Sequence, residues 1–235
     1  LMSRLRTRTV TVASAVCAVV VAGATLLGAH LASASLSEAD VTDPVVATLP
    51  SRVPLAPIVD AWPDSYTVVG SKSEPLYTER IEYAREGDLF VLRIKAIAQG
   101  DSSLGTQRGA VRVADDGTVT WVSGCTKDAA SCADDPALRG FLTTAAVVGL
   151  ERTGRLPDTG TARVLHGTPV VCVGDDDVHP DASPSTAGLD PCFSVATGAL
   201  LGHWSSASRA FVGPTLAPGF VETVGADDAL FAAVM

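Results

Sequence analysis

The chain has 235 residues, enough for one or two domains, and it carries 26 acidic against 17 basic side chains. The formal net charge of −9 argues against binding to nucleic acid or to anionic lipid surfaces, because both bind basic surfaces. The sequence contains no glycine-rich phosphate loop and no His-Glu-x-x-His motif, so it predicts no cofactor.

The first 34 residues have the three parts of an export signal. Arginines at positions 4, 6 and 8 precede an apolar stretch, Val10–Leu27, and Ala32-Ser33-Ala34 matches the pattern that signal peptidases cleave. Because about 18 apolar residues can span a bilayer, residues 1–34 predict either a signal peptide or a membrane anchor. Both readings predict a secreted or extracytoplasmic protein, and this segment would be its only membrane contact if it stays uncleaved.

Residues 35–65 contain five prolines and no sustained periodicity, which predicts a Pro-rich linker. Residues 66–235 are expected to form a single domain outside the cytoplasm. Its first strand is expected at residues 66–69.

Two hairpins are predicted in the first half of this domain. Residues 80–84 and 89–98 flank a turn at Arg85-Glu86-Gly87-Asp88, with apolar side chains alternating along the second arm. Residues 99–107 are expected to be a polar loop. Residues 109–114 and 118–123 then bracket Asp115-Asp116-Gly117, a strong hairpin signal.

An amphipathic helix is expected from Pro136 to Gly154, with Asp135 as its N-cap. Two further hairpins are expected, at residues 161–173 around His166-Gly167 and at residues 192–204 around Thr197-Gly198; short strands at 211–212 and 220–224 and a last helical turn at 227–234 follow. One helix among several hairpins predicts an α+β fold, with the helix packed on one face of an antiparallel sheet.

Four cysteines lie in the exported part of the chain: Cys125, Cys132, Cys172 and Cys192. In an oxidising compartment they predict two disulfides, with three connectivities to choose from. Pairing between neighbours, Cys125–Cys132 and Cys172–Cys192, is the expectation. A zinc site is disfavoured because no short Cys-x-x-Cys spacing and no histidine pair is present.

An acidic stretch between the last two cysteines is the densest group of metal-ligand side chains. It contains Asp175, Asp176, Asp177 and His179. Carboxylate oxygens suit calcium, but the spacing is not that of an EF-hand, so a solvated acidic loop is the competing reading.

No catalytic residue is assigned, because the sequence lacks the Gly-x-Ser-x-Gly nucleophile motif. His166, His179 and His203 leave open an extracellular hydrolase in which the fold brings a histidine near a serine or an aspartate.

Three segments resemble the LolA-like, or LppX/LprG-like, envelope proteins of actinobacteria. They are the hairpins before Gly124-Cys125, the strand Gly167–Cys172, and the hairpin Cys192–Leu201. The resemblance implies a curved antiparallel sheet, a half-barrel, closed by helices over an apolar lipid-binding cavity. It implies no role for any individual residue.

Together these features predict a non-catalytic envelope protein that binds an apolar, lipid-like ligand or another envelope component. The alternatives are the hydrolase and a purely structural or interaction domain on a stalk. The face of the sheet distinguishes them, because a lipid carrier needs a hollow apolar surface there.

Overall fold

The computed structural model describes residues 51–98, 103–124, 136–178 and 188–235, with the side chains of 136–139 excepted. All of them belong to one compact unit, Ala47–Met235. The predicted signal peptide or anchor lies outside the described residues. Within the described ranges, no helix has the length and apolar character needed to cross a bilayer.

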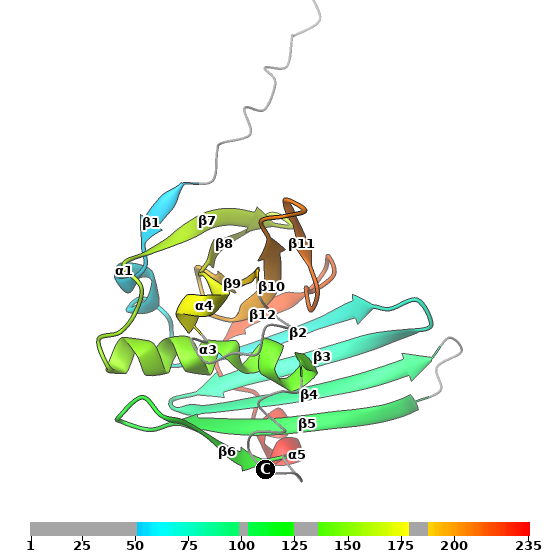
Figure 1. Ribbon diagram of the computed structural model, residues 1–235. Helices are drawn as coiled ribbons and strands as arrows, with labels where there is room; N and C mark the ends of the chain where they lie inside the picture. Colours follow the sequence, from blue (N-terminus) through cyan, green and yellow to red (C-terminus); the bar gives the residue numbers. More distant parts are fainter. Residues whose placement is uncertain (1–50, 99–102, 125–135, 179–187) are drawn as a thin grey trace, which may run out of the picture. The chain divides into compact units, whose positions relative to one another are not determined.

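Twelve strands of the described chain form two open six-stranded sheets, and every strand pair is antiparallel (Figure 1). Sheet A has the order β1-β7-β8-β9-β10-β11, and sheet B has the order β12-β2-β3-β4-β5-β6. In chain order the elements are β1 (Arg52–Pro54), α1 (Ala56–Val59), β2 (Ser65–Ser73), β3 (Tyr77–Glu86), β4 (Leu89–Ala98), β5 (Ser103–Val113), β6 (Val119–Ser123), α3 (Pro136–Arg152), β7 (Thr159–Leu165), β8 (Thr168–Cys172), α4 (Asp175–Val178), β9 (Leu189–Ser194), β10 (Leu200–Ser205), β11 (Ala210–Val212), β12 (Val221–Val224) and α5 (Asp228–Val234).

The predicted hairpins of sheet B are confirmed, and local turn chemistry explains them. Between β3 and β4, Gly87 has φ +57°, a conformation that glycine adopts at low cost. Between β5 and β6, the amide of Thr118 donates to Asp116 Oδ1 at 2.9 Å, and Gly117 has φ +77°. The polar loop expected at residues 99–107 is shorter than predicted, because β5 already begins at Ser103.

The central helix α3 lies between the two sheets, in contact with β4 and β5 on one side and with β9 and β10 on the other (Figure 1). From Gly140 to Gly149 every residue except Ala146 is buried. The expectation of an amphipathic helix on one face of one sheet is therefore wrong. The helix's own side chains along this stretch are mostly small or apolar on every side, a composition that suits burial all around.

Two hydrogen bonds from buried hydroxyls link these layers. Tyr83 of β3 donates through its hydroxyl to the Leu200 carbonyl of β10. Thr144 of α3 donates to the Gly198 carbonyl at 2.8 Å. Tyr83 and Thr144 are almost fully buried, so each hydroxyl needs such a partner.

Helix α5 covers part of the opposite face of sheet B. Its side chains Leu230, Phe231 and Val234 form a second apolar cluster with small or branched residues of β3, β4 and β5. Asp227 begins the helix, and its carboxylate accepts from the amides of Ala229 and Leu230. This confirms the helical turn expected at residues 227–234.

The hairpins expected in sheet A are also confirmed. His166 and Gly167 have φ of +49° and +88° in the turn between β7 and β8. Pro169 lies one residue after the start of β8, where a missing amide costs little.

The folded unit begins before Tyr66, inside the segment expected to be a linker. Strand β1 pairs with β7, and α1 follows it. Leu55, Val59 and Trp62 are buried in the main core. Their burial is the physical reason why this proline-rich segment orders on the sheets.

The α+β expectation is confirmed in part. The described chain is mostly antiparallel sheet with few helices, but it forms two sheets where one was expected. One disulfide, Cys172–Cys192, lies among the described residues.

Candidate functional site

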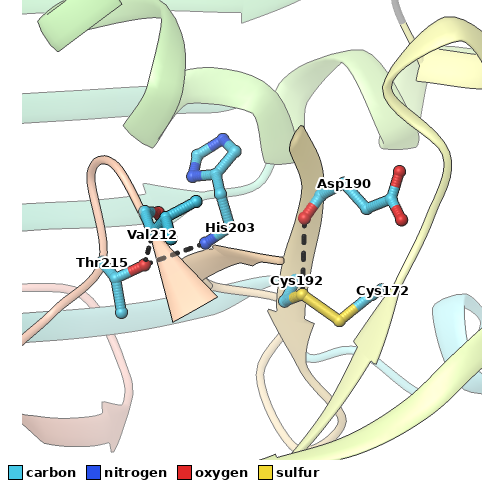
Figure 2. The surroundings of a disulfide bond; sticks show 6 residues. All are labelled: Cys172, Asp190, Cys192, His203, Val212 and Thr215. Atoms are coloured by element: carbon cyan, nitrogen blue, oxygen red, sulfur yellow. Dashed lines mark hydrogen bonds between the residues drawn. A yellow bond between two sulfur atoms is a disulfide. The ribbon is translucent and has the colours of Figure 1, made fainter. Parts of the chain in front are cut away.

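The disulfide between Cys172 and Cys192 joins adjacent strands β8 and β9 (Figure 2). The two residues face each other directly in the ladder, with 3.9 Å between their Cα atoms. Both are almost fully buried. This confirms the expected pairing of Cys172 with Cys192, and it assigns the bond to the framework. Cys125 and Cys132 lie outside the described residues, so their pairing stays a prediction.

An arginine–aromatic cluster lies on the same sheet. The guanidinium of Arg163 stacks over Trp204, 3.5 Å from the ring centroid, and Trp204 meets Phe211 edge to face. Burial lowers the pKa of Arg163, an effect that the charge of Asp190 opposes. Burial likewise raises the pKa of Asp190 above its usual range. Arg163 thus stacks on an aromatic ring of its own sheet, and its buried Nε has no hydrogen-bond partner among the described residues.

The acidic stretch forms the short helix α4. Asp175 is buried there, while Asp176 and Asp177 are exposed. Among the described residues, no three histidine, cysteine or acidic side chains converge on a point that could hold a metal ion. His179 lies outside the described residues, so the calcium hypothesis as a whole is not tested.

The described histidines lie in two different surroundings. His166 is exposed in the β7–β8 turn. His203 is buried in β10, and its backbone amide donates to Thr215 Oγ1 at 3.0 Å. Figure 2 shows the His203 imidazole pointing away from that hydroxyl. The hydroxyl itself donates to the Val212 carbonyl at 3.0 Å, so it has a structural partner. This geometry does not activate Thr215 as a nucleophile.

A groove lies at the end of sheet B where β2 turns into β3 and where β4 and β5 are joined. Its volume is about 460 Å³, and its lining comes from three strands: Tyr77, Glu79, Ile94, Ala96, Leu104, Gly105, Thr106 and Gln107. We call it the distal groove. Ile94 is also part of the main core, so the groove continues the face of sheet B that packs on α3.

Among the described residues, apolar side chains beside this groove are left uncovered. Leu104 is 60% exposed, and Leu76 in the adjacent β2–β3 turn is 78% exposed. Lys72 and Glu79 lie opposite each other in the ladder, with Nζ and Oε2 4.0 Å apart. The groove thus combines an apolar floor with a charged pair at one side, the general composition of small-ligand sites.

Sequence reasoning placed no ligand-binding residue in this groove. The alternation of Ile94 and Ala96 with Arg93 and Lys95 was a visible signal for a two-faced strand. The sequence did not show that α3 covers only part of the apolar face, because the end of a helix cannot be placed along a strand from periodicity.

Comparisons with models of protein families, with curated proteins and with solved structures found no match for this chain. Any functional assignment must therefore come from the geometry of the described residues.

Proposed function

We propose that this chain is a non-catalytic, exported protein of the cell envelope, and that its folded unit binds an apolar, lipid-like ligand in the distal groove. The observation that supports this proposal is the groove itself. Its volume of about 460 Å³ falls within the usual range for small-molecule sites, and Ile94, Ala96 and Leu104 line it.

The position of α3 argues for this site over an internal cavity. The space between the two sheets is occupied by α3 and by the apolar core around it, including Phe141 and Val148. The closed lipid cavity implied by a LolA-like half-barrel would need that space. An apolar chain lying in the open groove would instead bury its surface against side chains that are now in contact with water.

The Lys72–Glu79 pair suggests which end of a ligand is polar. Lys72 also forms an ion pair with Glu74, and its side chain is 25% exposed. A polar headgroup beside this pair could donate to Glu79 or accept from Lys72, while its alkyl chain follows the floor of the groove. The chemistry therefore favours an amphiphile with an alkyl chain and a polar headgroup.

The experiment uses cis-parinaric acid, a fluorescent fatty acid, titrated into the unit spanning residues 47–235. Ala96→Trp places a large ring in the groove and should weaken binding at least about tenfold, since the ligand loses its buried area. Val164→Trp is the matched control, because Val164 is 64% exposed on β7 and remote in the pairing order from the groove.

Two results would count against this function. One is unchanged affinity in Ala96→Trp. The other is an absence of probe binding together with no lipid in extracts and native mass spectra of the purified protein, which would favour a structural or interaction domain. The hydrolase hypothesis stays open, with no described contact to support it.

A further inference from the structure

The face of sheet B that carries α5 changes character beyond the helix. Next to α5 this face is apolar, with Ala84, Val91 and Ala110 under the helix. Further along the same strands and on the same face, the side chains are cationic: Arg80 of β3, Arg93 and Lys95 of β4, and Arg108 of β5. We call these four residues the cationic face.

The register places like charges directly opposite each other. Arg80 pairs with Lys95, and Arg93 pairs with Arg108. Directly opposed like charges weaken a sheet. Glu82 compensates in part, since Arg80 Nε and Arg93 Nε both donate to its carboxylate. No described carboxylate lies within ion-pair distance of Lys95 or Arg108.

This concentration of positive charge is unexpected in a chain of net charge −9. Lys95 and Arg108 are exposed, and the Arg80 side chain is 57% exposed. Folding alone gains nothing from such an arrangement, so an anionic partner is the physical reason that fits it.

The same strands end in exposed apolar side chains. Leu76 lies in the β2–β3 turn, and Leu104 is the second residue of β5. Figure 1 shows that turn, the end of β4 and the start of β5 at one end of sheet B. Leu76 and Arg80 are four positions apart, as are Leu104 and Arg108, which is about 13 Å along an extended strand. Long basic side chains at that distance can reach back toward a surface into which the leucines insert.

We propose that this end of sheet B docks on a membrane surface that contains anionic phospholipids, with Leu76 and Leu104 at the acyl boundary and the cationic face against headgroup phosphates. Exposed apolar residues beside a basic surface are the two requirements of peripheral membrane binding. At this end Glu74 and Glu79 form ion pairs with Lys72, and acidic groups farther away interfere little because salt screens charges beyond about 10 Å. This proposal does not depend on a ligand in the distal groove.

Vesicle sedimentation tests the proposal with the compact unit 47–235, which contains every described element and both apolar clusters and excludes the N-terminal apolar segment. One set of vesicles contains phosphatidylcholine alone. The other also contains about 30% phosphatidylglycerol, which gives the vesicles a negative surface. The unit should partition onto the anionic vesicles at least about tenfold more strongly.

The charge variant is Lys95→Gln with Arg108→Gln, which leaves both hydrogen bonds to Glu82 in place. It should lower partitioning onto anionic vesicles about 25-fold, at about fivefold for each charge. Arg112→Gln with Arg209→Gln removes the same charge from exposed positions outside the cationic face and should lower it less than threefold. Leu76→Ser with Leu104→Ser should weaken partitioning about tenfold or more.

All substituted residues are exposed, so circular dichroism and thermal unfolding should match the unsubstituted unit. Equal partitioning onto both vesicle types would overturn the proposal, as would equal effects of the two charge variants. A third result would also overturn it: binding that about 10 mM inorganic phosphate, a weak competitor, abolishes and that the leucine variant leaves unchanged. That result would indicate a site for free phosphate, which needs no apolar insertion.

Discussion

Glu82 lies between Arg80 and Arg93 and accepts a hydrogen bond from each guanidinium. Its burial opposes ionisation, but the bonds and charges of the two arginines outweigh this, so the pKa of Glu82 is lower than its ordinary value of 4.5. The ionised form therefore stabilises the fold above pH 4.5, and this contribution is lost as the pH falls through the folded-state value.

Glu82→Gln should accordingly cost about 2 kcal/mol at pH 7, because the charge-assisted bonds are lost. It should also flatten the fall in stability below pH 4.5. Urea unfolding at several pH values measures both effects. The control is Glu86→Gln, which makes the same chemical change at an exposed position on the same strand. A parallel acid dependence in Glu82→Gln and the unsubstituted protein would contradict the argument.

Gly198 and Gly167 illustrate two different reasons for glycine at a position: backbone conformation, and lack of space for a side chain. Both have positive φ, but a Cβ on Gly198 would lie 2.3 Å from the ring of Trp62, whereas a Cβ on Gly167 meets nothing within 4 Å. Gly167→Ala should cost about 1 kcal/mol from backbone strain alone. Gly198→Ala should cost about 3 kcal/mol, since the Trp62 ring must also move. Thermal unfolding measures the difference, and equal costs would show that the ring adjusts freely.

At the level of elements, α3 meets the β5–β6 turn through two glycines. A Cβ on Gly149 would lie 2.3 Å from the Gly117 carbonyl oxygen, a backbone atom that cannot turn aside. Gly140, in the same helix, faces only side chains, the nearest being Pro214 Cγ at 3.1 Å.

Alanine raises helix propensity by about 1 kcal/mol at either site. Gly140→Ala should therefore be neutral or slightly stabilising, while Gly149→Ala should lose about 1–2 kcal/mol net because the turn is displaced. Chemical unfolding of both variants tests this prediction. Similar stabilities would mean that the hairpin does not pack as closely as described.

The disulfide joins β8 to β9 and so closes the chain segment between Cys172 and Cys192 into a loop. In the chain-entropy model, closing this loop of 20 residues stabilises the fold by roughly 3 kcal/mol. Replacing Cys172 and Cys192 by alanine should lower the free energy of unfolding by about that amount. Because both sulfurs are buried, dithiothreitol should reduce the bond in urea but not in the native state. A peptide map without the Cys172–Cys192 link would refute this.

Local elements were predictable because their signals are local. The turns at Gly87, Gly117 and Gly167 and the cap at Asp227 depend on a few neighbouring residues, and each hairpin or helix formed where those residues indicated. The division into two sheets and the burial of α3 were not predictable, because pairing of β1 with β7 or β12 with β2 joins residues more than a hundred positions apart. The distal groove depends on that same long-range arrangement.

In the whole molecule, the chain alternates between the two sheets. Sheet A takes β1, then β7 to β11; sheet B takes β2 to β6, then β12 and α5. The sheets share α3 and one main apolar core. We therefore expect one cooperative unfolding transition.

Native-state hydrogen exchange measures this cooperativity. The amides of Leu92 in β4 and Phe193 in β9, which lie in different sheets of the same core, should exchange with the same free energy of opening. Tyr83→Phe, which removes the hydroxyl bond to Leu200, should lower both values equally, by about 1–2 kcal/mol. A lower value in one sheet alone would show that it opens as a separate unit.

The return of β12 to sheet B also constrains when this chain can fold. Strand β12 covers part of the edge of β2, so residues 66–69 gain their outer neighbour only after residues 221–224 have been synthesised and released. A chain emerging from a ribosome or a translocation pore therefore cannot complete sheet B early, and the exposed edge of β2 must wait for the last strand. For an exported chain, as proposed above, this delay would suit transport across the membrane in an unfolded state, with assembly on the far side.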